Sequence, residues 1–308
     1  MSQEHQKENK KLRVSFSQYS KYLKCPMSWK LDYLDGKRKF EASLNMCFGT
    51  AIHNALQTFI KALYTEGLAT ADSLDVFKLF KEDFKVQTDK AKTENTEFAY
   101  TDDEYTGFIV DGEDILKTLL STTNRRKYFP SNKYELVGIE LPLELDIKNN
   151  ISFVAFVDLV LKDKETGKIY ILDFKTSASG WNKYMQIDPC KTDQLLLYKA
   201  FYSKQYSVPL SDINVEFFIL KRKLFENASY PQSRIQLFSP NHNKSAVIET
   251  LNSFTKFVDS CFNKDGSYNT NGEYPMIAGK AYKNCKYCQH RKVNCFPKKE
   301  HTGDMLED

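Results

Sequence analysis

The chain has 308 residues and a formal net charge of +4. With 41% hydrophobic and 27% charged residues it has the composition of an ordinary globular protein, and no segment approaches the roughly 18 consecutive apolar residues that a membrane-spanning helix needs. Residues 1–14 are polar and lack the apolar centre of a signal peptide, so we expect a disordered tail and a cytoplasmic protein without a membrane partner.

The beginning of the chain predicts helices. Residues 15–35 indicate short helices, with Ser17 as an N-cap and Pro26 at a break or a first helical position. Residues 48–64 predict a longer helix, because apolar side chains recur at the 3.6-residue period. This stripe consists of Ala51, Ile52, Ala55, Leu56, Phe59, Ile60 and Leu63.

The middle of the chain predicts a sheet. Apolar and polar residues alternate over 134–147, as in a half-buried strand, which we expect to break near Pro142. Residues 151–163 are apolar on both faces until Asp158, which is typical of a central strand, and a turn at 165–167 leads into a third strand. This third strand covers 168–176, and further strands are predicted at 213–222 and 234–239. Further helices are predicted at 72–92, 102–128, 190–206 and 243–263, with loops at about 88–106.

Two acids and a lysine stand out in these strands. Residues i and i+2 of a strand share a face, so Asp173 and Lys175 project together. The turn pairs residues whose numbers sum to about 331, which places Asp158 opposite Asp173, with the carboxylates about 5 Å apart. The alternative is a purely structural role, in which Asp173 and Lys175 form a buried ion pair. That pair leaves Asp158 uncompensated in an apolar strand, which is costly.

Two carboxylates so close repel each other unless a cation lies between them. Mg²⁺ or Mn²⁺ fits this role, because hard cations prefer oxygen ligands. Lys175 would then orient or help to deprotonate an attacking water, or stabilise charge on a phosphate. The pattern therefore favours metal-dependent hydrolysis.

The segments FVDLVLKD and IYILDFKTS resemble motifs II and III of the PD-(D/E)XK nuclease superfamily. FGTAIHNAL resembles its motif I helix, DQLLLYKAF its Q-x-x-x-Y motif, and SFSQYSKYLKCPMSWKL its opening segment, all in the order of the RecB-like branch. The resemblance implies an α/β restriction-endonuclease-like fold with a mixed central sheet flanked by helices. It further implies a single nuclease domain over 15–300, with a helical insertion at about 65–130 and a C-terminal tail at 301–308.

The resemblance also implies roles for individual residues. His53, Asp158 and Asp173 would hold the metal, and Lys175 would serve the attacking water. Glu140 would be the additional acid that some members carry, although it is equally consistent with a solvated strand residue among other acids. Gln194 and Tyr198 would contact the nucleic-acid strand or support the metal site. Without the resemblance, His53 is an ordinary packed or surface residue, and Gln194 and Tyr198 form an ordinary i, i+4 helix contact. The family often has Gly three residues before the motif II acid, where this chain has Ala155.

Three cysteines near the C-terminus, Cys285, Cys288 and Cys295, have the spacing C-x2-C-x6-C. A tetrahedral zinc site or a cubane cluster requires a fourth soft ligand. The resemblance supplies Cys25 and implies a [4Fe-4S] cluster that joins the two ends of the chain, as in AddB-type and CRISPR-associated RecB-like nucleases. Zinc held by the same four thiolates remains the alternative. The remaining cysteines are expected to be small buried residues: Cys47, Cys190 and Cys261.

The same segment is basic. Seven lysines and arginines and one acid lie between residues 280 and 300, which suits a phosphate backbone as well as a solvated tail. Tyr282, Tyr287 and Phe296 would stack on bases there, or pack in the core.

These features predict a metal-dependent DNA nuclease, an exonuclease acting on DNA ends or single strands in recombination or repair. No G-x-x-x-x-G-K-[ST] motif is present, so we expect the protein to work alone or with a helicase or recombination partner. The alternatives are a non-catalytic nucleic-acid-binding module with the same fold and a zinc-stapled interaction domain.

Overall fold

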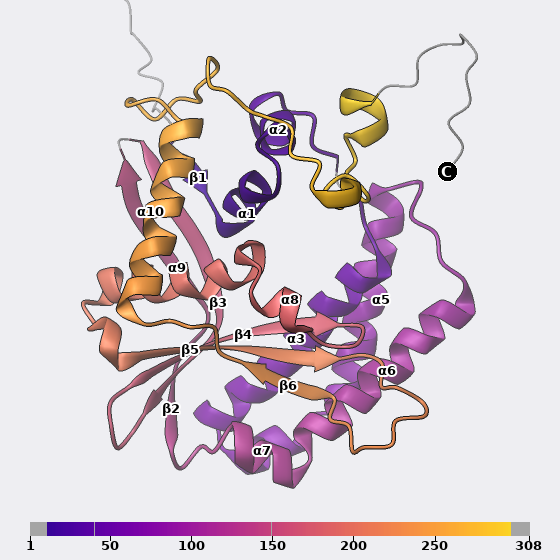
Figure 1. Ribbon diagram of the computed structural model, residues 1–308. Helices are drawn as coiled ribbons and strands as arrows, with labels where there is room; N and C mark the ends of the chain where they lie inside the picture. The colour runs from indigo at the N-terminus through magenta and orange to yellow at the C-terminus, as the bar shows by residue number, and fades with distance from the viewer. Residues whose placement is uncertain (1–10, 40, 149, 297–308) are drawn as a thin grey trace, which may run out of the picture.

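A six-stranded mixed sheet runs through the centre of the protein in the computed structural model, which describes residues 11–39, 41–148 and 150–296 (Figure 1). The strand order is β1-β3-β4-β5-β6, and β2 pairs with β3. The strands are β1 Leu12–Val14, β2 Tyr134–Lys148, β3 Ile151–Asp163, β4 Ile169–Ser177, β5 Ile213–Lys221 and β6 Ile235–Phe238. The expected mixed sheet flanked by helices is therefore confirmed.

Two groups of helices cover the sheet from opposite sides. One group shares a hydrophobic core with Leu172 and Phe174, and the other shares a core with Ile171 and Phe217, because successive strand residues point to opposite faces. The first group is α3 Leu44–Thr65, α4 Leu68–Ser73, α5 Val76–Glu94, α6 Asp102–Leu120 and α7 Thr122–Tyr128. The second is α1 Phe16–Lys24, α2 Pro26–Trp29, α9 Pro189–Tyr206 and α10 Lys244–Cys261, while the short α8 Lys183–Gln186 follows β4.

The long helix α3 forms as its apolar stripe predicts. All seven residues of the stripe are buried, and the helix starts earlier than expected, where Ser43 caps it by accepting a hydrogen bond from the Met46 amide. The chain from 72 to 128 also forms helices. The expected loop at 88–106 is shorter than expected, because α5 continues to Glu94 and α6 begins after the capping box of Thr101 and Glu104.

Three local expectations are corrected. Leu12–Val14 form β1 and pair in parallel with β3, so the expected N-terminal tail ends before residue 12; residues 1–10 lie outside the described part, as does the expected tail at 301–308. The N-cap of α1 is Ser15, and Ser17 lies inside the helix. Strand β2 continues through Pro142, because β2 pairs with β3 alone and an edge strand tolerates a missing amide.

The C-terminal segment of the described chain lies beside the early helices α1 and α2 (Figure 1). The Met27 amide donates to the carbonyl of Pro275, and the side chain of Asn284 donates to the carbonyl of Lys24. The buried Asp32 carboxylate contacts His290 at 2.6 Å and also pairs with Lys21. These contacts hold the C-terminal segment, which contains the short turns η3 Lys280–Tyr282 and η4 Arg291–Cys295, against α1 and α2.

Candidate active site

The two aspartates lie where strands β3 and β4 separate. The β3–β4 ladder runs from Lys162 paired with Ile169 to Leu159 paired with Leu172, so the numbers of paired residues sum to 331 and the predicted register is confirmed. Asp158 and Asp173 are the next residues along the two strands, just beyond the last pair of the ladder. Beyond this point β4 remains paired with β5 but no longer with β3. Oδ2 of Asp158 accepts a hydrogen bond of 2.7 Å from the amide of Phe174. The separation of the strands opens the space in which both carboxylates meet.

Asp173 carries an oxygen without a hydrogen bond. The residue is 1% exposed, and its Oδ2 is buried and has no hydrogen-bond partner within the described part of the chain. Nζ of Lys175 lies 2.7 Å from this oxygen, which makes an ion pair without the alignment of a hydrogen bond. Burial raises the pKa of Asp173, and Lys175 opposes this effect.

Asp158 is in a still less favourable position as an anion. Burial, and then the charge of Asp173, raise its pKa well above the usual range, whereas Lys175 and the Phe174 amide act against the rise. The negative charge of Glu140 raises the pKa of both aspartates. Two carboxylates in this situation share a proton or bind a cation.

His53 lies in the middle of α3, on the helix that packs against the sheet. Its Nδ1 lies 3.9 Å from Oδ2 of Asp158, and its ring stands 6.0 Å from the ring of Phe174. Burial, and then the charge of Lys175, lower the pKa of His53 to about 4. At neutral pH the imidazole is therefore uncharged, which is the form that can coordinate a metal.

Glu140 is held at the site by a hydrogen bond from Gln57, a residue that the sequence motifs do not indicate. Its backbone has φ = 47°, an uncommon conformation for a residue other than glycine. Its Oε1 accepts a hydrogen bond of 2.6 Å from Nε2 of the buried Gln57. Gln57 lies one helical turn after His53 on α3. A polar residue beside the apolar stripe of this helix was the one feature of the sequence that could have pointed to Gln57.

Helix α9 closes the other side of the site. Nε2 of Gln194 donates a hydrogen bond of 2.8 Å to the hydroxyl of Tyr198, so the expected i, i+4 contact forms. Burial, and then the charge of Asp173, raise the pKa of Tyr198, and its hydroxyl stays protonated. Residues from α3, β2, β3, β4 and α9 thus surround the two aspartates.

The donor set fits a divalent cation. It offers the orphaned oxygen of Asp173, a second carboxylate with a raised pKa, and a neutral imidazole, and Mg²⁺ is commonly bound through one or two carboxylates. In the described residues, no group of three or more His, Cys, Asp or Glu side chains already stands close enough together to hold a metal ion. The two carboxylates contact groups of the protein: Asp173 contacts Lys175, and Asp158 contacts the Phe174 amide.

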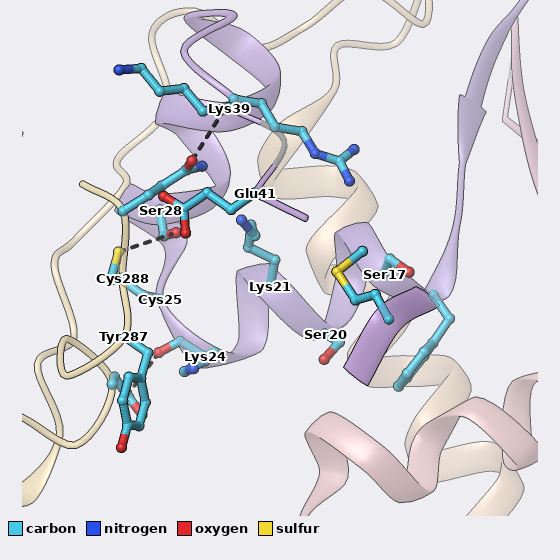
Figure 2. A pocket seen from close by; sticks show the side chains of 15 residues that line it. Ser17, Ser20, Lys21, Lys24, Cys25, Ser28, Lys39, Glu41, Tyr287 and Cys288 are labelled. Atoms are coloured by element: carbon cyan, nitrogen blue, oxygen red, sulfur yellow. Dashed lines mark hydrogen bonds between the residues drawn. The ribbon is translucent and has the colours of Figure 1, made fainter. Parts of the chain in front are cut away.

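The four cysteines assigned to a cluster lie between the two ends of the chain. Burial, and then the charges of Cys288, Cys25 and Cys285, raise the pKa of Cys295, so the four thiols are neighbours. Sγ of Cys288 lies 3.9 Å from Oγ of Ser28 (Figure 2). Sγ of Cys25 accepts a hydrogen bond from the Ile277 amide. All of them are free thiols and do not stand at metal-binding distances in the described structure. Of the three other cysteines, Cys47 and Cys261 are buried as expected, whereas Cys190 is partly exposed.

Comparison with known proteins agrees with this fold. The family model of the PD-(D/E)XK nuclease superfamily matches residues 13–293, and the chain belongs to this superfamily. A crystal structure of a "Putative exonuclease" from Eubacterium rectale superimposes with a TM-score of 0.51 at 11% identity, over 98% of this chain and 96% of the other. No curated protein matches the sequence. Among the described helices, none has the length and apolar character to cross a membrane.

Proposed function

We propose that the protein is a metal-dependent DNA nuclease of the RecB-like branch, an exonuclease that acts on DNA ends or single strands. The observation that carries this proposal is the partly buried Asp158 and the buried Asp173 at the fork of β3 and β4, with Lys175 beside them. A structural ion pair accounts for Asp173 and Lys175, but it leaves Asp158 with only the Phe174 amide and the neutral His53 ring beside it. A phosphodiester hydrolase that uses a metal ion would hold the ion with acids placed in this way.

Asp158, Asp173 and His53 would hold Mg²⁺ or Mn²⁺, with Glu140 as a further oxygen ligand. When bound, the ion supplies activation of water and stabilisation of charge at the phosphate. Lys175 is one-third exposed, so its ammonium reaches both the buried Asp173 and the open side of the site. In the proposed role, Lys175 orients the attacking water and stabilises the charge that develops on the phosphate.

The remaining residues position these groups. Gln57 holds the Glu140 carboxylate toward the aspartates. Tyr198 stays protonated beside Asp173, so its hydroxyl and the Gln194 amide can support the site or contact the substrate strand. We further propose that residues 15–300 form one nuclease domain, stapled by a [4Fe-4S] cluster at Cys25, Cys285, Cys288 and Cys295, with zinc as the alternative. DNA ends would come from a helicase or recombination partner, or be free ends.

End-labelled single- and double-stranded DNA, incubated with Mg²⁺ or Mn²⁺, tests the proposal. We expect the wild-type protein to shorten the DNA, and Asp173→Asn to lose this activity while it keeps the wild-type melting temperature within a few degrees. Asp146→Asn, which changes an exposed aspartate of β2, is the matched control and should remain active. Equal degradation by wild type and Asp173→Asn, or none by either, would refute the catalytic assignment.

A further inference from the structure

A cavity of about 500 Å³ lies beside the cysteines, between α1, the segment before α3 and the C-terminal segment (Figure 2). Four cationic side chains and a single acid, Glu41, line it. Lys21 and Lys24 come from α1, whereas Arg38 and Lys39 come from the segment that leads into α3. Serine hydroxyls from α1 and α2 add polar groups to the wall. A hollow lined by one sign of charge concentrates ligands of the opposite sign.

Three of these cations have no acidic partner in the described part of the chain. Lys21 pairs with the buried Asp32. In contrast, no described carboxylate lies within 4 Å of the charged groups of Lys24, Arg38 and Lys39, and Glu41 forms no ion pair there either. Three cations without an acidic partner around one cavity are suited to the phosphates of a polyanion.

Helix α3 contributes a residue to the cavity and a residue to the candidate active site. Met46 lines the cavity, and His53 lies seven residues later, which is two turns or about 10 Å along the same face. Gly49 lies between them, and a Cβ at this position would stand 3.1 Å from Oγ1 of Thr176, the residue after Lys175. Because Gly49 has no side chain, α3 packs closely against the end of β4 at this point. A short oligonucleotide can span this distance.

An aromatic ring stands at the same cavity. Tyr287 lines it and is 85% exposed, the largest exposed fraction among the large hydrophobic residues described. Nζ of Lys286 lies 5.2 Å from the centre of its ring. No packing role accounts for such an exposed ring, whereas an unpaired base can stack on it.

We propose that this cavity holds the single strand of the substrate next to the cleaved phosphodiester, a proposal that rests on the proposed nuclease function. Lys24, Arg38 and Lys39 contact phosphate oxygens, and Tyr287 stacks on a base. The volume is that of a small-molecule pocket, which matches one or a few nucleotides of an unpaired strand.

The cysteines provide the competing explanation. Cys25 and Cys288 also line the cavity, so its cations could serve a metal cluster instead of a strand (Figure 2). The two explanations differ in what is lost when the cations are removed. A strand site loses affinity for DNA, and a cluster site loses its metal.

The test measures binding without cleavage. In the Asp173→Asn background, with a chelator of free divalent ions, the affinity for a short fluorescein-labelled oligothymidylate is measured by anisotropy over a series of KCl concentrations. For the triple variant Lys24→Gln, Arg38→Gln and Lys39→Gln we expect a Kd at least about tenfold higher. The slope of log K against log[KCl] should fall in magnitude by about two units, since each lost phosphate contact on a single strand contributes about 0.7. The matched control removes three exposed lysines of α5, Lys78, Lys85 and Lys90, and should bind within about twofold of the parent.

A second variant tests the exposed ring separately from the cations. Tyr287→Ala removes a ring that is almost fully exposed, so the melting temperature should not change, while the Kd should rise at least about fivefold. Parent-like affinity of both variants would overturn the proposal. Loss of bound metal from the triple variant, with unchanged affinity of the protein that remains folded, would assign the cavity to the cysteine site. Strand binding without any cleavage by the wild type would remove the proposed nuclease function and leave the strand site intact.

Discussion

The carboxylate of Asp158 accepts a hydrogen bond of 2.7 Å from the backbone amide of Phe174, on the neighbouring strand. This contact fixes Asp158 at the point where β3 and β4 separate, one residue beyond the last pair of the ladder. Phe174 lies between Asp173 and Lys175 in the sequence, so this hydrogen bond brings Asp158 close to both of them. The predictions below follow from this arrangement.

Replacing Lys175 by methionine should lower DNA cleavage by about 10²–10³-fold, which is the usual effect of removing a preorganised charge from a reacting phosphate or acyl group. The ammonium is 2.7 Å from Asp173, so its loss also leaves that buried carboxylate without its ion-pair partner. Initial rates on end-labelled single strands provide the measurement. Lys162→Met on β3, which removes an exposed lysine paired with Glu135, is the control and should keep the wild-type rate. Wild-type cleavage by Lys175→Met would leave Lys175 as a structural partner of Asp173.

Replacing Gln57 by alanine should raise the Mg²⁺ concentration needed for half-maximal activity by about 10–100-fold, because groups that orient metal-binding residues have effects of this size. Gln57 acts through its hydrogen bond to Glu140 and not through the substrate. Metal titrations of activity separate this effect from a loss of maximal rate. Gln205→Ala is the control, because Gln205 also bonds to β2, at Pro142 and Glu144. If both variants titrate like the wild type, Glu140 does not take part in metal binding.

The sequence was sufficient for the register of the aspartates, because a short turn at 165–167 leaves little freedom in how the two flanking strands pair. It was not sufficient for Gln57, whose partner Glu140 is 83 residues away and is brought near by the packing of α3 on the sheet. The N-cap of α1 was misplaced for a local reason: two serines, Ser15 and Ser17, flank Phe16, and propensity alone does not distinguish them. The expected break at Pro142 failed because the edge position of β2 is a tertiary property.

Removing a cysteine assigned to the cluster should release its metal and loosen both ends of the chain. For Cys285→Ser we expect loss of bound iron, loss of the broad absorbance near about 400 nm that thiolate-bound clusters give, and a lower melting temperature. Cys190→Ser is the control, since Cys190 is partly exposed, lies on α9 and is not one of the four proposed ligands. Zinc without iron in the wild type would replace the cluster by a zinc site. Unchanged stability of Cys285→Ser would contradict the staple itself.

A single methyl group at Gly112 should destabilise the packing of α6 against α5. In the α5–α6 interface, a Cβ at Gly112 would stand 2.2 Å from Cζ of Phe80, a ring that is fully buried. Overpacking of this kind costs about 1–3 kcal/mol, so Gly112→Ala should melt at a lower temperature. Gly107→Ala, on the same helix with nothing within 4 Å, should instead stabilise the protein by about 0.5–1 kcal/mol, because alanine is the better helix former. Equal melting temperatures of the two variants would mean that Phe80 moves aside at no cost.

The buried Asp32 should make stability depend on pH below neutrality. Burial alone would raise its pKa, but hydrogen bonds from Lys21 and His290 lower it below the unfolded value of 3.8. A group whose pKa is lower in the folded state stabilises the protein fully above its unfolded pKa, and this contribution is lost as the pH falls through the folded pKa. Asp32→Asn should therefore cost about 3 kcal/mol at pH 7, the typical cost of breaking a buried pair, and the difference from wild type should shrink below a pH of about 4. Melting temperatures of both proteins between pH 7 and pH 3 measure this difference. A gap of constant size over the whole range would show that Asp32 holds the ends of the chain together by packing and not by charge.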